Sequence, residues 1–149
     1  MTEAARPWIP IEPGFFTIPE DHTHAPRLLG SRCSSCDEVF FPRRGICARC
    51  LARGTEDVEL GPRGTLYTWT YTRFPLFGSR RADVGGYGVG QVDLPEGPRV
   101  QAVLSGGPEA FRIGMEMELE LEVLRETPKG EDVVIFRFRP AREPSGAVR

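Results

Sequence analysis

Strict alternation of apolar and polar residues marks the second half of the chain as β-structure. In the segment 115–124, methionine, leucine and valine alternate with glutamate, so that a strand would have one apolar and one acidic face. A helix would spread the same glutamates around its circumference, and a strand is therefore favoured despite the helix propensity of glutamate. In the segment 65–72, threonine alternates with aromatic residues, which predicts a strand with Tyr67, Trp69 and Tyr71 on one face.

Turn residues divide the rest of this region into further strands. Apolar-rich runs predict three of them, at residues 87–94, 99–104 and 132–138. The first two are joined by the turn Pro95-Glu96-Gly97-Pro98 and form a hairpin. The connection 106–114 is short and rich in glycine, with room for one helical turn. Five strands in this order predict a mostly β fold, with a five-stranded OB-fold barrel over residues 61–140.

The first 26 residues show no such period. Prolines interrupt any helix here, at Pro7, Pro10, Pro13, Pro19 and Pro26. Large apolar side chains lie between them, at Trp8, Ile9, Ile11, Phe15, Phe16 and Ile18. An arm this apolar needs a surface to cover, and its own domain and a partner subunit are both open. We expect residues 1–26 to form an extended, irregular arm and residues 141–149 a loose polar tail.

The four cysteines of the chain form two C-x2-C pairs, Cys33/Cys36 and Cys47/Cys50. Each pair brings two thiolates to one ion, because the backbone doubles back within four residues. Two facing pairs supply the four tetrahedral sulfurs that Zn²⁺ favours in closed structural sites. Short strands are expected around the pairs, at residues 27–32, 39–42 and 56–60. Residues 27–60 are therefore predicted to be a rubredoxin-like zinc ribbon.

Other interpretations of the cysteines fit less well. Disulfides are disfavoured, because no secretory signal precedes them and the chain is large enough to fold without covalent staples. Four thiolates also hold iron, so iron is not excluded as the metal. Zinc is preferred because the short spacer, with no second redox motif, indicates a scaffolding role. His22 and His24 form a His-x-His in the arm, where isolated imidazoles are more often solvated than metal-bound.

Composition places the chain among small water-soluble proteins. It has 149 residues, a formal net charge of −2 and 40% hydrophobic residues, which suits one domain or two small units. No run of about 18 apolar residues is present, so we expect no membrane span. The N-terminus lacks the apolar core of a signal peptide, and we expect a cytoplasmic protein. Arginines gather around the cysteines, whereas Glu116, Glu118, Glu120 and Glu122 make one later strand acidic.

These residues predict no active site. The cysteines are committed to a metal, so no free thiol remains as a nucleophile, and the serines lack a nearby base. The glutamates of the acidic strand are interpreted as a solvated outer face. Nucleic-acid binding is the main alternative function, because Tyr67, Trp69 and Tyr71 are followed by the arginines Arg73, Arg80 and Arg81. The negative net charge and the acidic strand make nucleic acid an unlikely partner.

The order of these segments resembles the DUF35 family. The resemblance rests on the cysteine ribbon with Phe40-Phe41-Pro42-Arg43 between its pairs and on Gly64-Thr65-Leu66-Tyr67 opening the barrel. It extends through three later segments, at residues 87–99, 113–117 and 136–140, and covers about residues 15–140. Members of this family are zinc-ribbon and OB-fold proteins associated with acyl-CoA enzymes.

The resemblance implies a non-catalytic accessory subunit. Such proteins bind and stabilise thiolase-fold enzymes, including thiolases and the retro-aldolases of steroid side-chain breakdown, and help shape an acyl-CoA site. Some are partners of MaoC-type enoyl-CoA hydratases. Thiolase-fold enzymes are commonly dimers, which suggests by analogy a heterotetramer of two plus two.

The loop 73–86 is the candidate surface for a partner or for CoA. It contains two aromatic residues and three arginines, Arg73, Phe74, Phe77, Arg80 and Arg81, which suit an acyl-CoA with its phosphates and adenine. Its glycines would allow a ligand or partner to approach the backbone closely. We expect this loop and the apolar arm to form the partner interface.

Overall fold

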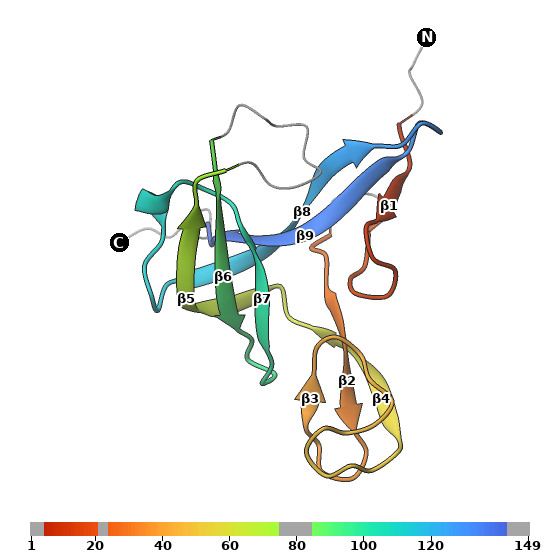
Figure 1. Ribbon diagram of the computed structural model, residues 1–149. Coiled ribbons are helices and arrows are strands. Elements are labelled where there is room, and N and C mark those ends of the chain that lie inside the picture. Colours follow the sequence, from red (N-terminus) through yellow and green to blue (C-terminus); the bar gives the residue numbers. More distant parts are fainter. Residues whose placement is uncertain (1–4, 21–23, 75–84, 143–149) are drawn as a thin grey trace.

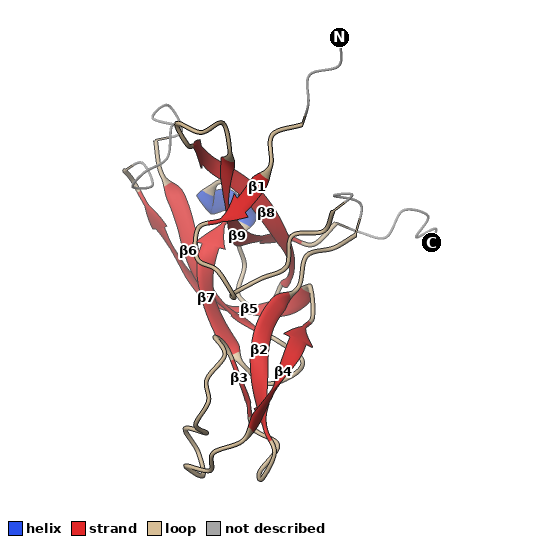
Figure 2. Cartoon of the chain, turned by 90° about the vertical axis from the view of Figure 1, so that its right-hand side faces the viewer, coloured by secondary structure: helices blue, strands red, loops and turns tan. Residues whose placement is uncertain are grey.

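The computed structural model describes residues 5–20, 24–74 and 85–142, and within these ranges its regular secondary structure is β-strand apart from one 3₁₀ turn. Figure 1 shows two units: a barrel formed by the later strands and a narrow ribbon that projects from it. Turning the molecule by 90° leaves the ribbon at the same end, below the barrel strands (Figure 2). The chain therefore forms two units, a small sheet that carries the cysteines and a larger barrel.

The ribbon is a three-stranded antiparallel sheet. Its central strand, β2 (Leu28–Cys33), lies between β3 (Val39–Phe40) and β4 (Thr55–Leu60). The pairing of β2 with β4 runs without interruption from Leu28 opposite Leu60 to Cys33 opposite Thr55. All three strands lie where the sequence predicts them, because the turns of the cysteine pairs leave only short extended segments between them.

The larger unit is a closed barrel of five strands, namely β5 (Arg63–Thr72), β6 (Tyr87–Asp93), β7 (Arg99–Leu104), β8 (Glu116–Glu126) and β9 (Asp132–Pro140). The strands follow the order β9-β7-β6-β5-β8, and pairing of β8 with β9 closes the ring. The β7–β9 pair is parallel and the others are antiparallel. The 3₁₀ turn η1 (Pro108–Ala110) occupies the connection before β8. The fold class predicted from the sequence, a zinc ribbon followed by an OB-type barrel, is confirmed.

The arm before the ribbon is mostly irregular but contributes one short strand that the sequence did not indicate. Strand β1 (Trp8–Pro10) pairs in parallel with β9, with Trp8 opposite Asp132 and Pro10 opposite Val134. Proline is tolerated there because β1 is an edge strand, whose outward amides need no partner. Further along, Phe16 is buried and bridges to Leu28. This part of the arm therefore packs on its own domain.

One hydrophobic core joins the two units. Leu28 and Leu60 of the ribbon are fully buried together with barrel residues such as Met117 and Phe138. Four aromatic rings extend this core toward the arm in a chain of edge-to-face contacts, Phe15–Phe41–Phe136–Phe16. The ribbon is thus held against the barrel by shared packing rather than by a flexible linker.

The prediction that three aromatic residues share one face of β5 is wrong. The pairing of β5 with β6 shifts between Leu66 and Thr68, which is a β-bulge. A bulge inserts one residue and so reverses the alternation beyond it. Tyr67 is therefore 47% exposed, whereas Trp69 and Tyr71 pack against the core.

Glu116 of β8 is 57% exposed, as predicted, but the other glutamates of its acidic face are not the solvated surface that the sequence suggests. These glutamates lie opposite the arginines of β9 and form ion pairs, Glu118–Arg139, Glu120–Arg139, Glu120–Arg137 and Glu122–Arg137. These side chains are only 16–21% exposed. A cavity of about 320 Å³ lies beside them, lined in part by Trp8 and Pro26 of the arm. The arm and the neighbouring strand together remove this face from bulk water.

Candidate metal centre and partner surface

The two cysteine pairs adopt the same backbone turn, which we call a knuckle. In the first knuckle the N–H of Asp37 donates to the carbonyl of Cys33, and in the second the N–H of Leu51 donates to the carbonyl of Cys47, both at 3.0 Å. The residue that follows each pair is left-handed, with φ of 62° at Asp37 and 64° at Leu51. This conformation reverses the chain, so that both cysteines of a pair point to the same side.

The two knuckles face each other and bring the four sulfurs into one cluster. All four Sγ atoms lie within 4.8 Å of one another. The distances are 3.6 Å between the sulfurs of Cys33 and Cys50 and 3.6 Å between those of Cys36 and Cys47. Tetrahedral coordination at a metal–sulfur distance of about 2.3 Å places the sulfurs about 3.8 Å apart. The four residues are free thiols, not disulfides, and their geometry fits one tetrahedral metal ion.

Backbone amides point at the sulfurs of the cluster. The N–H of Ser35 donates to Sγ of Cys33, and the N–H groups of Arg49 and Cys50 donate to Sγ of Cys47. Desolvation opposes ionisation at Cys47, but these amides outweigh it and lower its pKa to about 6. Such N–H···S bonds stabilise the thiolate, which is the form that binds a metal.

The thiol of Cys36, in the first knuckle, shows the opposite tendency and resists ionisation. The backbone N–H of Glu38 favours the thiolate of Cys36, but burial and the neighbouring thiols prevail and raise its pKa to about 12. Four thiolates this close repel one another unless a cation lies between them. Metal binding would therefore displace protons from the cluster.

The cluster is closed rather than catalytic in form. Cys33 and Cys47 are completely buried, and all four tetrahedral corners are sulfur, which leaves no position for water or substrate. An ion pair of 2.9 Å between Glu38 and Arg49 also connects the two knuckles. The site therefore has the features of a structural metal centre.

The candidate loop after β5 is described only at its beginning. Phe74 is 63% exposed and its ring contacts the edge of Tyr87, at 6.2 Å between centroids. The guanidinium of Arg73 lies 5.5 Å from the ring of Tyr71. The other three predicted residues, Phe77, Arg80 and Arg81, lie outside the described residues. A role of this loop as a partner or CoA surface stays a prediction.

The sequence did not indicate an apolar groove that the structure shows next to Tyr87, the first residue of β6. It has a volume of about 430 Å³ and is lined mainly by the arm and by the outer face of β6, β7 and β9, at Ile11, Tyr87, Val89, Val103 and Ile135. The signal was present in β6, where the inward positions are the glycines Gly88 and Gly90 and the valine Val89 points outward. Those glycines make room for Phe111 and Leu104 in the core.

Within the described part of the chain, no helix has the length and apolar character needed to cross a membrane. The architecture is that of a protein in which a four-cysteine ribbon is fused to an OB-type barrel. Two family models cover these units: "ChsH2, rubredoxin-like zinc ribbon domain" matches residues 25–56, and "ChsH2, C-terminal OB-fold domain" matches residues 57–122.

Comparison with curated proteins identifies the family. The chain is 33% identical over 127 residues to the benzoylsuccinyl-CoA thiolase subunit BbsA of Thauera aromatica, covering 85% of each chain. It is 33% identical over 145 residues to a DUF35 domain-containing scaffold protein of Methanothermobacter thermautotrophicus, covering 94% of this chain and 98% of the relative. The chain belongs to the DUF35 family.

A solved structure supports the same assignment. The fold matches a chain of the Ltp2-ChsH2(DUF35) aldolase with a TM-score of 0.61 and 28% sequence identity. The match covers 76% of this chain and 84% of that one. The fold is therefore shared with a chain of a solved structure named as an Ltp2-ChsH2(DUF35) aldolase.

Proposed function

We propose that this chain is a non-catalytic, zinc-binding accessory subunit that binds and stabilises a thiolase-fold acyl-CoA enzyme. The observation that carries the proposal is similarity over 85% of the chain to a protein named as a thiolase subunit. Relatives named as scaffold proteins support a role in assembly rather than in chemistry. The closed form of the sulfur cluster agrees with this role, because such a centre holds a fold without offering a reactive site.

The outer face of the barrel supports a protein partner. In OB folds, the face formed by the second and third strands commonly receives the ligand. Here that face belongs to β6 and β7 and carries the apolar groove, with Val89 and Val103 paired across it. A contiguous apolar surface of this kind is typical of protein contacts. Ile11 of the arm, one of the two segments expected at the partner interface, also lines this groove.

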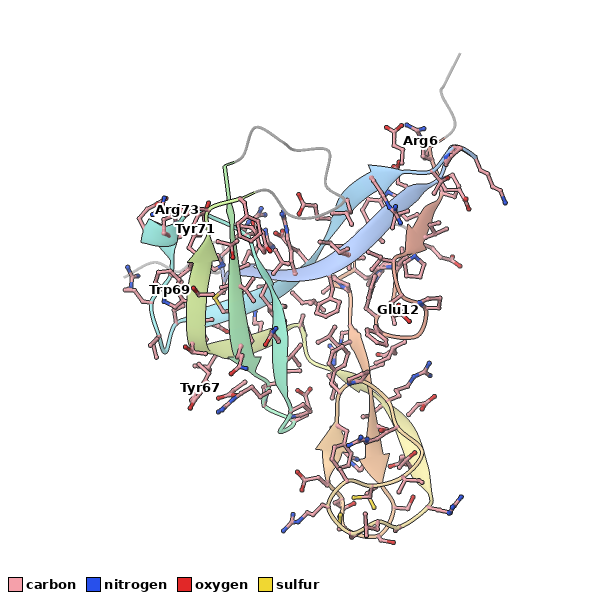
Figure 3. All side chains as sticks on the ribbon, viewed as in Figure 1. Arg6, Glu12, Tyr67, Trp69, Tyr71 and Arg73 are labelled. Atoms are coloured by element: carbon pink, nitrogen blue, oxygen red, sulfur yellow. The ribbon has the colours of Figure 1, made fainter. Side chains whose placement is uncertain are left out.

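The same structure gives less support to nucleic-acid binding. One face of the Tyr67 ring is covered by the guanidinium of Arg99, at 3.3 Å from the centroid, and Trp69 packs on Phe111. Figure 3 shows Tyr67 and Arg73 well apart, with Tyr67 midway along β5 and Arg73 just after the strand ends, so these residues do not form one stacking platform. Binding of single strands needs exposed aromatic faces beside a basic groove.

The metal is proposed to be Zn²⁺ in a structural role. Its ligands would be Cys33, Cys36, Cys47 and Cys50, whose sulfurs are arranged as tetrahedral coordination requires. Elemental analysis of the purified chain is expected to find about one zinc per chain. If the purified protein is coloured and contains stoichiometric iron, the proposed metal becomes iron, and the four cysteine ligands stay the same.

The partner is proposed to be a thiolase or a retro-aldolase of steroid side-chain breakdown, in a complex of two plus two chains. The relatives named for a thiolase and an aldolase support these two enzyme classes. Within such a complex, the loop from Arg73 would help shape the acyl-CoA site. The alternative partner, which the family resemblance also implies, is a MaoC-type enoyl-CoA hydratase.

Co-expression tests this function directly. The full chain, carrying an affinity tag, is produced together with a thiolase-fold enzyme from the same genome, and light scattering measures the mass of the purified complex. We expect a stable complex of two plus two chains with more soluble and more active enzyme than the partner has alone. Co-purification with a hydratase instead, or binding to single-stranded DNA at low salt without binding to the enzyme, would overturn the proposal.

A further inference from the structure

Leu51, the residue after the second cysteine pair, occupies a position that a leucine rarely takes. Its φ of 64° is left-handed, a conformation in which Cβ crowds the backbone and which favours glycine, asparagine or aspartate. Its side chain is nevertheless 75% exposed. Leu51 therefore gains little packing that would offset the strain of its backbone.

The first knuckle provides an internal comparison. Asp37 occupies the matching position, with φ of 62° and the same hydrogen bond to the carbonyl of the first cysteine. Aspartate is suited to this conformation, so the turn itself does not require a leucine. An unfavourable residue that remains strained and exposed points to a role outside the chain.

Two neighbours give this position the form of a contact surface. Ile46 is 46% exposed and forms a bridge to Arg53 across the base of the second knuckle. Together Ile46, Leu51 and Arg53 make what we call the knuckle patch. Its backbone is held by the sulfur cluster and by the Glu38–Arg49 ion pair, so the patch is presented on a rigid support.

The charge of the patch is available to a partner. Other arginines of the ribbon meet acidic residues of the same chain, in the pairs Arg32–Glu56, Arg43–Asp57 and Arg49–Glu38. Arg53 is exposed and forms no ion pair with the part of the chain that the structure describes. An apolar projection beside an unneutralised arginine fits an apolar pocket with a carboxylate at its rim.

We propose that the knuckle patch is a docking contact for the thiolase-fold partner, with Leu51 inserted into an apolar pocket and Arg53 paired with an acidic group beside it. This inference rests on the proposed function and names a second region of contact, remote in sequence from the arm and the loop. In protein interfaces, most of the binding energy commonly comes from a few anchor residues surrounded by weaker contacts.

The test uses Leu51→Asn in the full chain, co-expressed with the thiolase-fold enzyme from the same genome. Asparagine tolerates the left-handed conformation, so the variant is expected to keep its zinc and its thermal stability. Its affinity for the partner is expected to fall about ten-fold or more, as is that of Arg53→Glu. Leu51→Met, which keeps an apolar side chain, is expected to retain most of the wild-type affinity.

Ile113→Asn is the matched control, because Ile113 is a 71% exposed apolar residue of the barrel and lies outside the knuckle patch. It is expected to bind the partner as the wild-type chain does. Wild-type affinity in Leu51→Asn would overturn the docking contact and leave the proposed function standing. Loss of zinc from Leu51→Asn would assign the residue a structural role instead. A wild-type chain that does not bind the thiolase-fold protein, or that uses the patch for self-association, would overturn the inference, and the former result would also remove the proposed function.

Discussion

Arg137 on β9 lies directly opposite Glu120 on β8, with its Nε 2.7 Å from a carboxylate oxygen of that glutamate. Arg137 also pairs with Glu122, and Arg139 pairs with Glu118 and Glu120. The result is a ladder of alternating charges along the closing seam of the barrel. Because its members are largely withdrawn from water, loss of one arginine removes positive charge that solvent can only partly replace.

Replacing Arg137 by alanine is therefore expected to weaken the fold. It removes the ion pairs that Arg137 makes with Glu120 and Glu122, which are only 21% and 16% exposed. The free energy of unfolding should fall by about 2 kcal/mol, which urea denaturation followed by circular dichroism would measure.

The control for this ladder is Arg63→Ala, which removes an ion pair between the same kinds of side chain. The pair Arg63–Glu116 is 42% and 57% exposed, and its loss should change stability by less than about 0.5 kcal/mol. Equal effects of the two substitutions would contradict the claim that burial makes the ladder important.

Gly30→Ala is expected to disturb the junction of ribbon and barrel. A Cβ atom at residue 30 would lie 2.4 Å from the carbonyl oxygen of Phe40 and 2.8 Å from Cδ1 of Leu60. Overpacking of this kind typically costs about 1–3 kcal/mol. We expect a lower melting temperature and faster loss of metal to a chelator.

Gly45→Ala provides the comparison within the same ribbon. A Cβ atom there meets nothing within 4 Å, so the variant should melt and retain metal as the wild-type chain does. If Gly30→Ala melted and retained metal as Gly45→Ala does, that result would contradict the close packing of β2 against β3 and β4.

The pair of Asp93 and Arg99 predicts a pH dependence of stability. Hydrogen bonds from Arg99 lower the pKa of Asp93 below its ordinary value, against a smaller opposing effect of desolvation. A carboxyl whose pKa is depressed in the folded state stabilises the fold above its unfolded pKa of about 3.9. That contribution is lost as the pH falls through the folded pKa.

Asp93→Asn isolates this contribution. We expect the wild-type chain to exceed the variant in melting temperature at pH 6, and the difference to shrink as the pH is lowered below about 4. Thermal unfolding of both proteins from pH 6 to pH 2.5 measures it. A difference that stays constant over this range would show that Asp93 acts through packing and not through its charge.

Cys36→Ser tests the metal centre. Structural zinc in small domains contributes on the order of 10 kcal/mol, so loss of one ligand should release the metal and unfold the ribbon. Because Leu28 and Leu60 of the ribbon are part of the common core, the barrel should also melt at a lower temperature. Metal content and thermal unfolding are the measurements. Retained metal with unchanged stability would contradict coordination by four cysteines.

The strands were predictable because their signals are local. The turn residues around β6 and β7 and the alternation in β8 locate these strands to within about two residues of their observed bounds. The sulfur cluster was predictable for the same reason, since each C-x2-C turn positions its own two thiols. β1 gave no such signal, because three residues are too few to show a period.

The groove and the position of Tyr67 were not predictable in this way. A β-bulge between Leu66 and Thr68 reverses the side-chain direction of β5, and no residue in the sequence marks it. In β6, glycines face the core, and the space beside them is filled by Phe111 and Leu104 from other parts of the chain. Which face a residue joins then depends on neighbours far away in the chain.

The sequence by itself determined the cysteine knuckles, the order of the barrel strands and the two chemically distinct faces of β8. Each of these depends on residues within a few positions of one another. Only the tertiary structure decided that the glutamates of β8 meet the arginines of β9, that the arm adds β1 to the barrel and that Leu51 is both strained and exposed. The physical reason is that charge pairing, burial and exposure depend on strand register and on which elements pack together. The cysteines specify how the ribbon folds, and the packing of the whole chain specifies the surface that it presents.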